Sequence, residues 1–310
     1  MLYFWILFNL FALGILVLDL RVFHRPGRAV PPRNALLWSA LWVLLAAAFA
    51  ALLWFWQGRQ PMLEFVTGYV LELSLSVDNL FIFLVIFRYF AVPEEQQHGV
   101  LFWGILGALI LRGIFIFAGV GLIHHFHWVL YVFGVLLIRS GIKLCLVGEH
   151  QVDPKKNPVV RALRRWIPMT DDYHGSRFFV RDWRGNVGLY ATPLLMVLAI
   201  IETTDVLFAV DSIPAVLAIT LNTFIVYTSN VFAILGLRSM YFAIAQLIKM
   251  FRFLHYGLAA VLIFVGTKML LADHFRIPTH ITLGIIATVL LISVVLSRMY
   301  PKSPADTESQ

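Results

Sequence analysis

The sequence predicts an all-α membrane protein of about nine transmembrane helices that contains an inverted repeat. Three observations support this prediction: an apolar composition, a series of apolar runs long enough to cross a bilayer, and an acidic motif that occurs twice. Hydrophobic residues make up 60% of the 310 residues, charged residues 13%, and the mean hydropathy is +0.84. A chain this apolar is solvated by lipid rather than by water.

Charge and cysteine content exclude two other classes of protein. The net charge of +7 is explained by basic loops that face anionic lipid, and no basic and aromatic binding motif is present. We therefore expect no nucleic-acid partner. The single cysteine, Cys145, rules out an intrachain disulfide and a thiolate metal cluster within one chain.

Nine apolar runs approach the length of about 20 residues that a membrane-spanning helix needs. They occupy residues 2–20, 35–56, 63–87, 99–123, 128–147, 189–212, 222–240, 255–272 and 279–297. Arginines follow the first run, and most of the 24 Lys and Arg residues fall in alternate loops. Because basic loops stay in the cytoplasm, this asymmetry places the N-terminus outside and the C-terminus inside.

These runs divide the chain into five regions. They are two peripheral transmembrane helices (1–60), a first three-helix repeat (61–147), a cytoplasmic loop (148–188), a second three-helix repeat (189–275), and a last transmembrane helix with a cytoplasmic tail (276–310). The hydrophilic loop is interpreted as a solvated connector, with a gate or regulatory segment as the alternative.

The acidic motif stands in the third and sixth runs. Residues 72–81 read ELSLSVDNLF and residues 205–214 read DVLFAVDSIP, so that Glu72 aligns with Asp205, Asp78 with Asp211 and Asn79 with Ser212. Glu202 adds a carboxylate one turn before Asp205. An ionised side chain in hydrocarbon costs from about 3 to more than 10 kcal/mol. Such residues are therefore expected to face a partner, water or a cation.

Two basic residues continue the duplication. Arg112 answers Arg238 at an offset of 126 residues and Lys143 answers Lys268 at 125, close to the offset of 133 between the acidic motifs. Since each unit has three helices, the second unit starts from the opposite side of the membrane, which makes the repeat an inverted one. Transporters of this architecture bind substrate near the bilayer midplane.

The residue types of the motif predict the chemistry of the site. Carboxylate, amide and hydroxyl oxygens suit Mn²⁺, Mg²⁺ or Ca²⁺, and arginines or protons would balance the surplus negative charge. A structural ion-pair network and a proton-only pathway are the alternatives. In an unbroken helix, Asp205 and Asp211 point about 120° apart. A break at Pro214 would bring them together and free the carbonyl of Val210 for an ion.

The segments ELSLSVDNLFIF, IETTDVLFAVDSIPA and SNVFAILGLRSMYF resemble the TerC/Alx family of bacterial inner-membrane proteins, over about residues 60–275. The resemblance implies a fold related to LysE-type exporters and Mn²⁺ export that protects the cell. Leu73 stands where relatives such as Alx have a lysine. The family's acidic positions fall on a set of five residues in this chain: Glu72, Asp78, Glu202, Asp205 and Asp211.

We therefore expect a secondary transporter in the bacterial inner membrane that exports Mn²⁺, coupled to protons. The five carboxylates form the predicted ligand set, Asn79 and Ser212 add oxygens, and Arg112 and Arg238 are counter-charges. A scaffold that delivers metal to partner proteins or docks them through the loop 148–188 is the alternative. We expect no enzymatic activity and no cofactor beyond transported Mn²⁺. Membrane lipid is the surrounding partner, and a homo-oligomer is compatible with the sequence.

Overall fold

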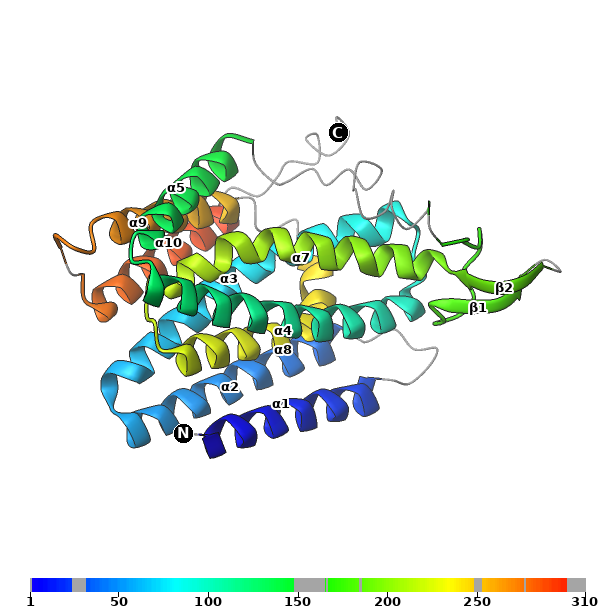
Figure 1. Ribbon diagram of the computed structural model, residues 1–310, viewed down its shortest axis with the longest axis horizontal. Helices are drawn as coiled ribbons and strands as arrows, with labels where there is room; N and C mark the ends of the chain where they lie inside the picture. The colour runs from blue at the N-terminus through cyan, green and yellow to red at the C-terminus, as the bar shows by residue number, and fades with distance from the viewer. Residues whose placement is uncertain are drawn as a thin grey trace.

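The computed structural model describes residues 2–23, 32–147, 165, 167–183, 186–247, 253–275 and 277–299. These residues form nine helices and one β-hairpin (Figure 1). The elements are α1 (Leu2–Phe23), α2 (Pro32–Gln57), α3 (Arg59–Tyr89), α4 (Glu94–His125), α5 (Val129–Val147), β1 (Phe179–Trp183), β2 (Asn186–Ala191), α7 (Pro193–Leu217), α8 (Thr223–Leu247), α9 (Leu254–Leu270) and α10 (Thr279–Met299).

Six of the described helices are long and apolar enough to cross a membrane: α2, α3, α4, α5, α7 and α10. Shorter apolar segments lie in α1, α8 and α9. The prediction of an all-α membrane protein is confirmed to this extent. Nine spans, their orientation and the inverted repeat remain predictions.

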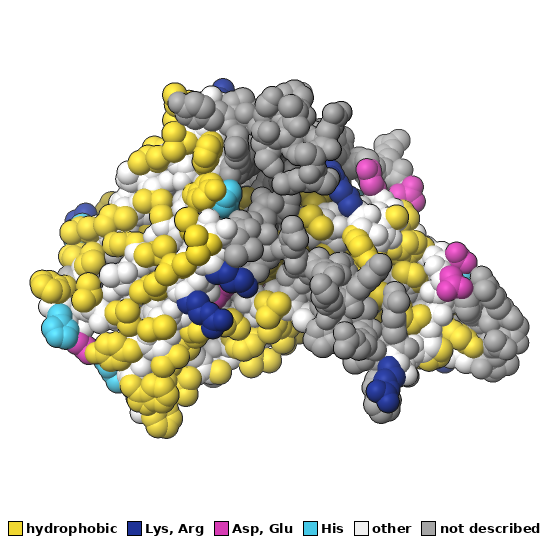
Figure 2. Space-filling model, turned by 90° about the horizontal axis from the view of Figure 1, so that it is seen from above, with side chains coloured by type: hydrophobic (Ala, Val, Ile, Leu, Met, Phe, Trp, Pro, Cys, Tyr) yellow, Lys and Arg dark blue, Asp and Glu magenta, His cyan; other side chains and the backbone are white. Residues whose placement is uncertain are grey.

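The surface of the bundle is apolar where lipid would surround it. Figure 2 shows hydrophobic side chains over much of one face. On α2, Leu44 is 65% exposed and Phe55 is 87% exposed. An apolar surface this extensive would aggregate in water but is solvated by acyl chains.

Two hydrophobic clusters fill the interior. The first joins α1, α2 and α8 to parts of α3, α4 and α7, and contains Phe65 and Phe232. The second joins α5, α9 and α10 to α3, α4 and α7, and contains Leu137 and Val265. Because α3 and α7 contribute to both clusters, the helices that carry the acidic motifs stand where the two cores meet.

Helices α5 and α9 approach each other closely at glycines. A Cβ built on Gly134 would lie 3.0 Å from the carbonyl oxygen of Gly266, and one on Gly141 would lie 2.8 Å from that of Ala259. Backbone atoms cannot yield to a side chain as a flexible neighbour does. Glycine is therefore required at these crossing points.

Replacing Gly141 with leucine is expected to force α5 from α9 and to lower the free energy of unfolding by about 1–3 kcal/mol. Thermal unfolding in detergent, followed by size-exclusion chromatography, measures the loss. Gly121→Ala is the matched control, because a Cβ at Gly121 on α4 has no atom within 4 Å. Equal melting temperatures for the two variants would contradict the close contact.

The predicted hydrophilic loop contains a structured part. Strands β1 and β2 pair antiparallel, with Phe179 opposite Ala191 and Arg181 opposite Leu189. The hairpin projects from the end of the bundle where α7 begins (Figure 1). Residues 148–164 of the predicted loop lie outside the described residues. The interpretation as a connector stays a prediction, and at its C-terminal end residues 179–183 and 186–191 form a hairpin that the sequence analysis did not identify.

Candidate ion-binding site

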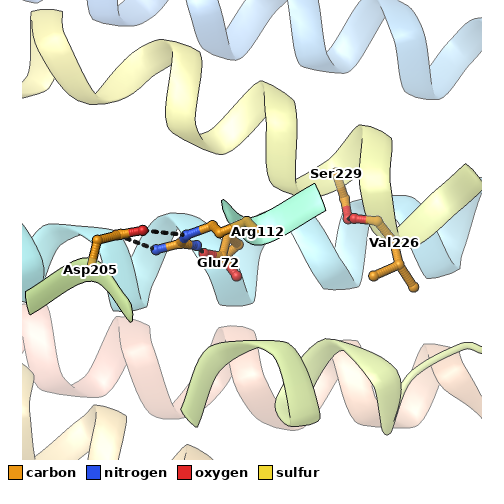
Figure 3. Close-up of polar contacts among 5 residues, drawn as sticks. All are labelled: Glu72, Arg112, Asp205, Val226 and Ser229. Atoms are coloured by element: carbon orange, nitrogen blue, oxygen red, sulfur yellow. Dashed lines mark hydrogen bonds and ion pairs between the residues drawn. The ribbon is translucent and has the colours of Figure 1, made fainter. Parts of the chain in front are cut away.

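Three charged side chains from three helices meet inside the bundle (Figure 3). Arg112 of α4 lies between Glu72 of α3 and Asp205 of α7. Its Nη2 donates to Asp205 Oδ1 at 2.9 Å and its Nε donates to Asp205 Oδ2 at 3.2 Å. Its Nη1 forms an ion pair with Glu72 Oε1. The guanidinium thus joins the two motif positions that the repeat aligns.

Burial makes this trio costly unless its charges are balanced. The exposed fractions are 0% for Glu72, 1% for Arg112 and 4% for Asp205. Desolvation of buried ions costs several kcal/mol each, and good geometry is needed to offset it. Two carboxylates against one guanidinium leave a negative charge when both acids are ionised. A further cation or a proton would balance the site.

The trio lies near the middle of its helices. Asp205 is the central residue of α7, and Glu72 stands two residues from the centre of α3. Since both helices are long enough to cross a membrane, their centres correspond to the bilayer interior. Ionisable residues at this depth mark ion or proton pathways.

Glu202 occupies the next turn of the same face of α7. Its carboxylate lies against Gly107 of α4, at the position that a Cβ on Gly107 would occupy. Glu202 Oε2 is buried and has no hydrogen-bond partner among the described residues. Gly107 is therefore what makes room for this carboxylate between α4 and α7.

Asp211 points elsewhere. Ser140 Oγ on α5 donates to Asp211 Oδ1 at 2.6 Å, whereas Asp205 faces Arg112 on α4. Helix α7 runs unbroken from Pro193 to Leu217 with Pro214 inside it. Of the two possibilities that the sequence left open, α7 therefore adopts the unbroken helix. The acids diverge as an unbroken helix requires.

The hydroxyl groups of the motifs divide into two sets. Ser74, Thr203 and Thr204 donate to carbonyls four residues earlier in their own helices, at 2.6–2.7 Å. Ser76 Oγ and Ser212 Oγ are buried and have no hydrogen-bond partner among the described residues. The second set therefore has both its donor and its acceptor capacity open, whereas the first set has used its proton and keeps only acceptor lone pairs.

Ser76 is a residue that the predicted ligand set missed. It stands one turn after Glu72, and the spacing of four residues puts both on one face of α3. Asn79, which was predicted, is 3% exposed on the same helix. Asn230 of α8 was also missed; its Nδ2 is buried without a hydrogen-bond partner among the described residues. A polar pair, Ser229-Asn230, inside an apolar run is the signal that marks it.

The structure leaves part of the predicted set open. The side chains of Asp78 and Arg238 lie outside the described residues. In the described part of the chain, no three His, Cys, Asp or Glu side chains converge closely enough to hold a metal ion. The trio of Glu72, Arg112 and Asp205 is thus an ion-paired arrangement rather than a metal-ready one.

The segment before the hairpin is fastened over the end of the bundle. Tyr173 Oη donates to the carbonyl oxygen of Phe90, just after α3, at 2.6 Å. The Thr170 N–H donates to the carbonyl oxygen of Ala191 on β2, and the Ala191 N–H donates to that of Pro168, both at 2.9 Å. A cavity of about 590 Å³ lies beneath, lined by residues that include Met169 and Met196.

Tyr173→Phe is expected to loosen this segment by about 0.5–1.5 kcal/mol, the value of one hydrogen bond. Burial raises the pKa of the Tyr173 phenol, so it stays protonated and donating at neutral pH. Because the folded pKa is raised, the contribution is present below the unfolded pKa and is lost as the pH rises through the folded pKa. Faster proteolysis within residues 167–178 of the variant measures the change, and an unchanged rate would contradict it.

Comparison with known proteins places these features in a family context. The profile of the "Integral membrane protein TerC family" matches residues 57–305. A Myxococcus xanthus protein named "Uncharacterized membrane protein STKORF319" is 49% identical over 306 residues, 97% of this chain and 95% of that protein. Proteins named Alx, proposed membrane-bound redox modulators, also match. The one from Photorhabdus laumondii is 45% identical over 96% of this chain and 94% of its own length. The one from Escherichia coli K12 is 44% identical over 91% and 90%. No solved structure matches the chain.

Proposed function

The chain belongs to the TerC family of integral membrane proteins, and from this premise we propose that it is a secondary transporter that exports Mn²⁺ across the bacterial inner membrane in exchange for protons. Glu72, Glu202 and Asp205 serve as cation ligands and proton carriers, together with Asp78 and Asp211. Ser212 and Asn79 contribute oxygens, and Arg112 and Arg238 are counter-charges. The protein has no catalytic role in this proposal.

One observation carries the proposal. Glu72 and Asp205 share a single guanidinium at the centre of the bundle, and Glu72 Oε2, Ser76 Oγ and Glu202 Oε2 have no hydrogen-bond partner in the described part of the chain. Buried acceptor oxygens without donors cost free energy and are rare in native proteins. A hard divalent cation or protons would satisfy them.

Helix packing supports the inverted repeat on which alternating access depends. A Cβ on Gly68 of α3 would meet Ser229 of α8, and one on Gly104 of α4 would meet Ile201 of α7. With the offset of 133 residues between the repeats, Gly68 aligns with Ile201. With the offset of 126 residues, Gly104 aligns with Asn230, which is next to Ser229. The two contacts are therefore equivalent under a twofold exchange of the repeats.

The α5–α9 pair fits the same relation. With the offset of 125 residues, Gly141 aligns with Gly266 and Gly134 aligns with Ala259. If the two repeats are interchanged, the contact between Gly134 and Gly266 therefore becomes the contact between Ala259 and Gly141. A twofold axis between α5 and α9 is consistent with the proposed inverted repeat, and the proposal keeps nine spans with the N-terminus outside and the C-terminus inside, as the distribution of basic residues indicates.

The redox role in the name of the Alx relatives is not part of the proposal. The sequence contains one cysteine, Cys145, which is exposed on α5. One thiol cannot form the intrachain dithiol–disulfide pair on which thiol-exchange proteins depend.

Metal flux in proteoliposomes tests the function. Vesicles that contain the purified protein are loaded with Mn²⁺. Efflux is followed with and without an inward proton gradient, in which the outside solution has the lower pH. The proposal expects protein-dependent efflux that a gradient accelerates. Mg²⁺ and Ca²⁺, tested in parallel, identify the cation. If efflux of all three cations is no faster than from vesicles that lack the protein, the proposed function is wrong.

Gly107→Val is expected to lower Mn²⁺ efflux by about tenfold or more, because the new side chain displaces the Glu202 carboxylate. Initial rates over a range of Mn²⁺ concentrations measure the effect. Gly99→Ala is the control, since a Cβ at that position of α4 meets no atom within 4 Å. If the Gly107 variant transports with wild-type kinetics, Glu202 does not contribute to the cation site.

The scaffold alternative rests on the hairpin, where Phe179 is 45% exposed and Leu189 is 55% exposed. Exposed apolar residues on a projecting hairpin suit a protein partner. Deleting residues 179–191 separates the two functions: lost partner capture with intact efflux favours the scaffold, and lost efflux with a folded bundle favours a role in transport.

A further inference from the structure

We propose that Arg112 is a tethered cation that occupies the Glu72 and Asp205 carboxylates whenever no metal is bound, and that the transported metal must displace it. The inference rests on the proposed transport function and deepens it. Arg112 is a positioning residue in this scheme: it does not bind the metal but determines when its ligands are free.

The geometry of the guanidinium leaves little of the site to a metal. Arg112 engages both oxygens of Asp205, at 2.9 and 3.2 Å, and Oε1 of Glu72. Of the four carboxylate oxygens, Glu72 Oε2 is the one to which Arg112 forms neither a hydrogen bond nor an ion pair. Each of these oxygens keeps a second lone pair, but a divalent cation bound there would lie next to the guanidinium charge, and repulsion between two cations is strong in a buried site. Chelation by Glu72 and Asp205 together therefore requires Arg112 to withdraw.

Charge explains why the empty site needs this cation. With 0% and 4% of their surfaces exposed, Glu72 and Asp205 would face each other across the bundle as unbalanced anions if Arg112 were absent. Such an arrangement is strongly destabilising in a buried setting. In the metal-free transporter Arg112 balances one of the two negative charges and a proton on one of the acids balances the other, so that the transporter returns with a proton in place of the metal. A divalent cation carries enough charge to replace Arg112 at both acids.

The displaced guanidinium has an acceptor nearby on α7. Arg112 extends from α4, whose side chains lean toward the helix N-terminus and thus toward Gly107. Glu202 lies against Gly107 and stands three residues before Asp205, with Oε2 unpartnered among the described residues. When metal enters, Arg112 can therefore exchange Asp205 for one oxygen of Glu202 and leave the other oxygen of that carboxylate to the metal. The buried positive charge keeps a partner in both states.

Two modes of flux separate this role from a purely structural one. Net efflux requires the empty transporter to return, whereas exchange of external Mn²⁺ for internal radioactive Mn²⁺ does not. We expect Arg112→Gln to lower net efflux by at least about thirtyfold, equivalent to about 2 kcal/mol. Exchange should persist, at a lower Mn²⁺ concentration for half-maximal rate, because the competitor is gone.

Arg112→Lys is the second variant, since it keeps the charge but cannot donate to three carboxylate oxygens from one plane. Its rate of net efflux should lie between that of the wild type and that of Arg112→Gln. If Arg112→Gln fails to fold, Arg112→Lys tests the tethered cation in its place. Arg139→Gln, an exposed arginine on α5, is the control and should leave both modes unchanged.

The outcomes are distinguishable. No flux in either mode by the wild-type protein overturns the transport function and this inference with it. Wild-type flux in both modes, with net efflux and exchange falling in parallel in a folded Arg112 variant, leaves transport standing and overturns the tethered cation. Selective loss of net efflux supports it.

Discussion

Mn²⁺ efflux from vesicles that contain Asp205→Asn protein is expected to fall at least about 100-fold, because the substitution removes a charged ligand from a buried site. Asparagine keeps the shape of aspartate and one acceptor oxygen. Arg112 retains Glu72 as a full counter-charge. The variant should therefore fold and reach the membrane at a normal level, so that the loss lies in transport.

The control for this measurement is Asp172→Asn, which neutralises an exposed aspartate at the end of the bundle. It should transport at the wild-type rate. If Asp205→Asn transports normally in protein that is folded by size-exclusion chromatography, Asp205 does not bind the cargo, and the trio is then a structural ion pair.

Neutralising both acids together should damage the protein far more than neutralising either one. In Glu72→Gln/Asp205→Asn protein, Arg112 is an unpaired buried cation, and the expected loss is about 3–5 kcal/mol of folding free energy. Each single variant leaves one ion pair intact. The double variant should therefore be less stable than the sum of the single effects predicts.

Adding Arg112→Met to the double variant should restore most of the lost stability, since no buried charge then remains. Thermal unfolding of the single, double and triple variants measures this cycle. Additive losses, or no recovery in the triple variant, would contradict the description of the trio as one electrostatically coupled unit.

Sequence reasoning located the trio but not its arrangement. Because ionised carboxylates are costly in an apolar run, the acidic motifs predicted a partner charge, and Arg112 was a basic residue in a neighbouring run. Spacing alone could not show that Arg112 engages Glu72 and Asp205 at the same time, because this depends on how α3, α4 and α7 cross. The glycines that set such crossings, such as Gly107, have no periodic signal.

The direction of Asp211 shows the same limit. Helical geometry predicted that Asp205 and Asp211 diverge in an unbroken helix, and Pro214 suggested a break that is absent. Pro214 removes one donor, that of the Val210 carbonyl, and only three helical residues follow it, so the distortion stays within the last turn of α7. The contact with Ser140 required knowledge of α5, which lies far away in sequence.

The hairpin was missed because the hydrophilic composition of residues 148–188 was read as a whole. Within it, FVRDW (Phe179–Trp183) and NVGLYA (Asn186–Ala191) contain aromatic and β-branched residues that favour strands, and only two residues separate them in sequence. Two such runs in close succession are the local signal of a hairpin. In a membrane protein, the contrast between apolar spans and polar loops obscures it.

The most direct test of a buried cation site at the centre of α3 and α7 is a structure of the Mn²⁺-loaded protein with anomalous scattering recorded at the manganese edge. The account predicts a peak between the carboxylates of Glu72 and Asp205, with the guanidinium of Arg112 withdrawn from both. A peak elsewhere, or none, with Arg112 still bridging the two acids at saturating Mn²⁺, would contradict it.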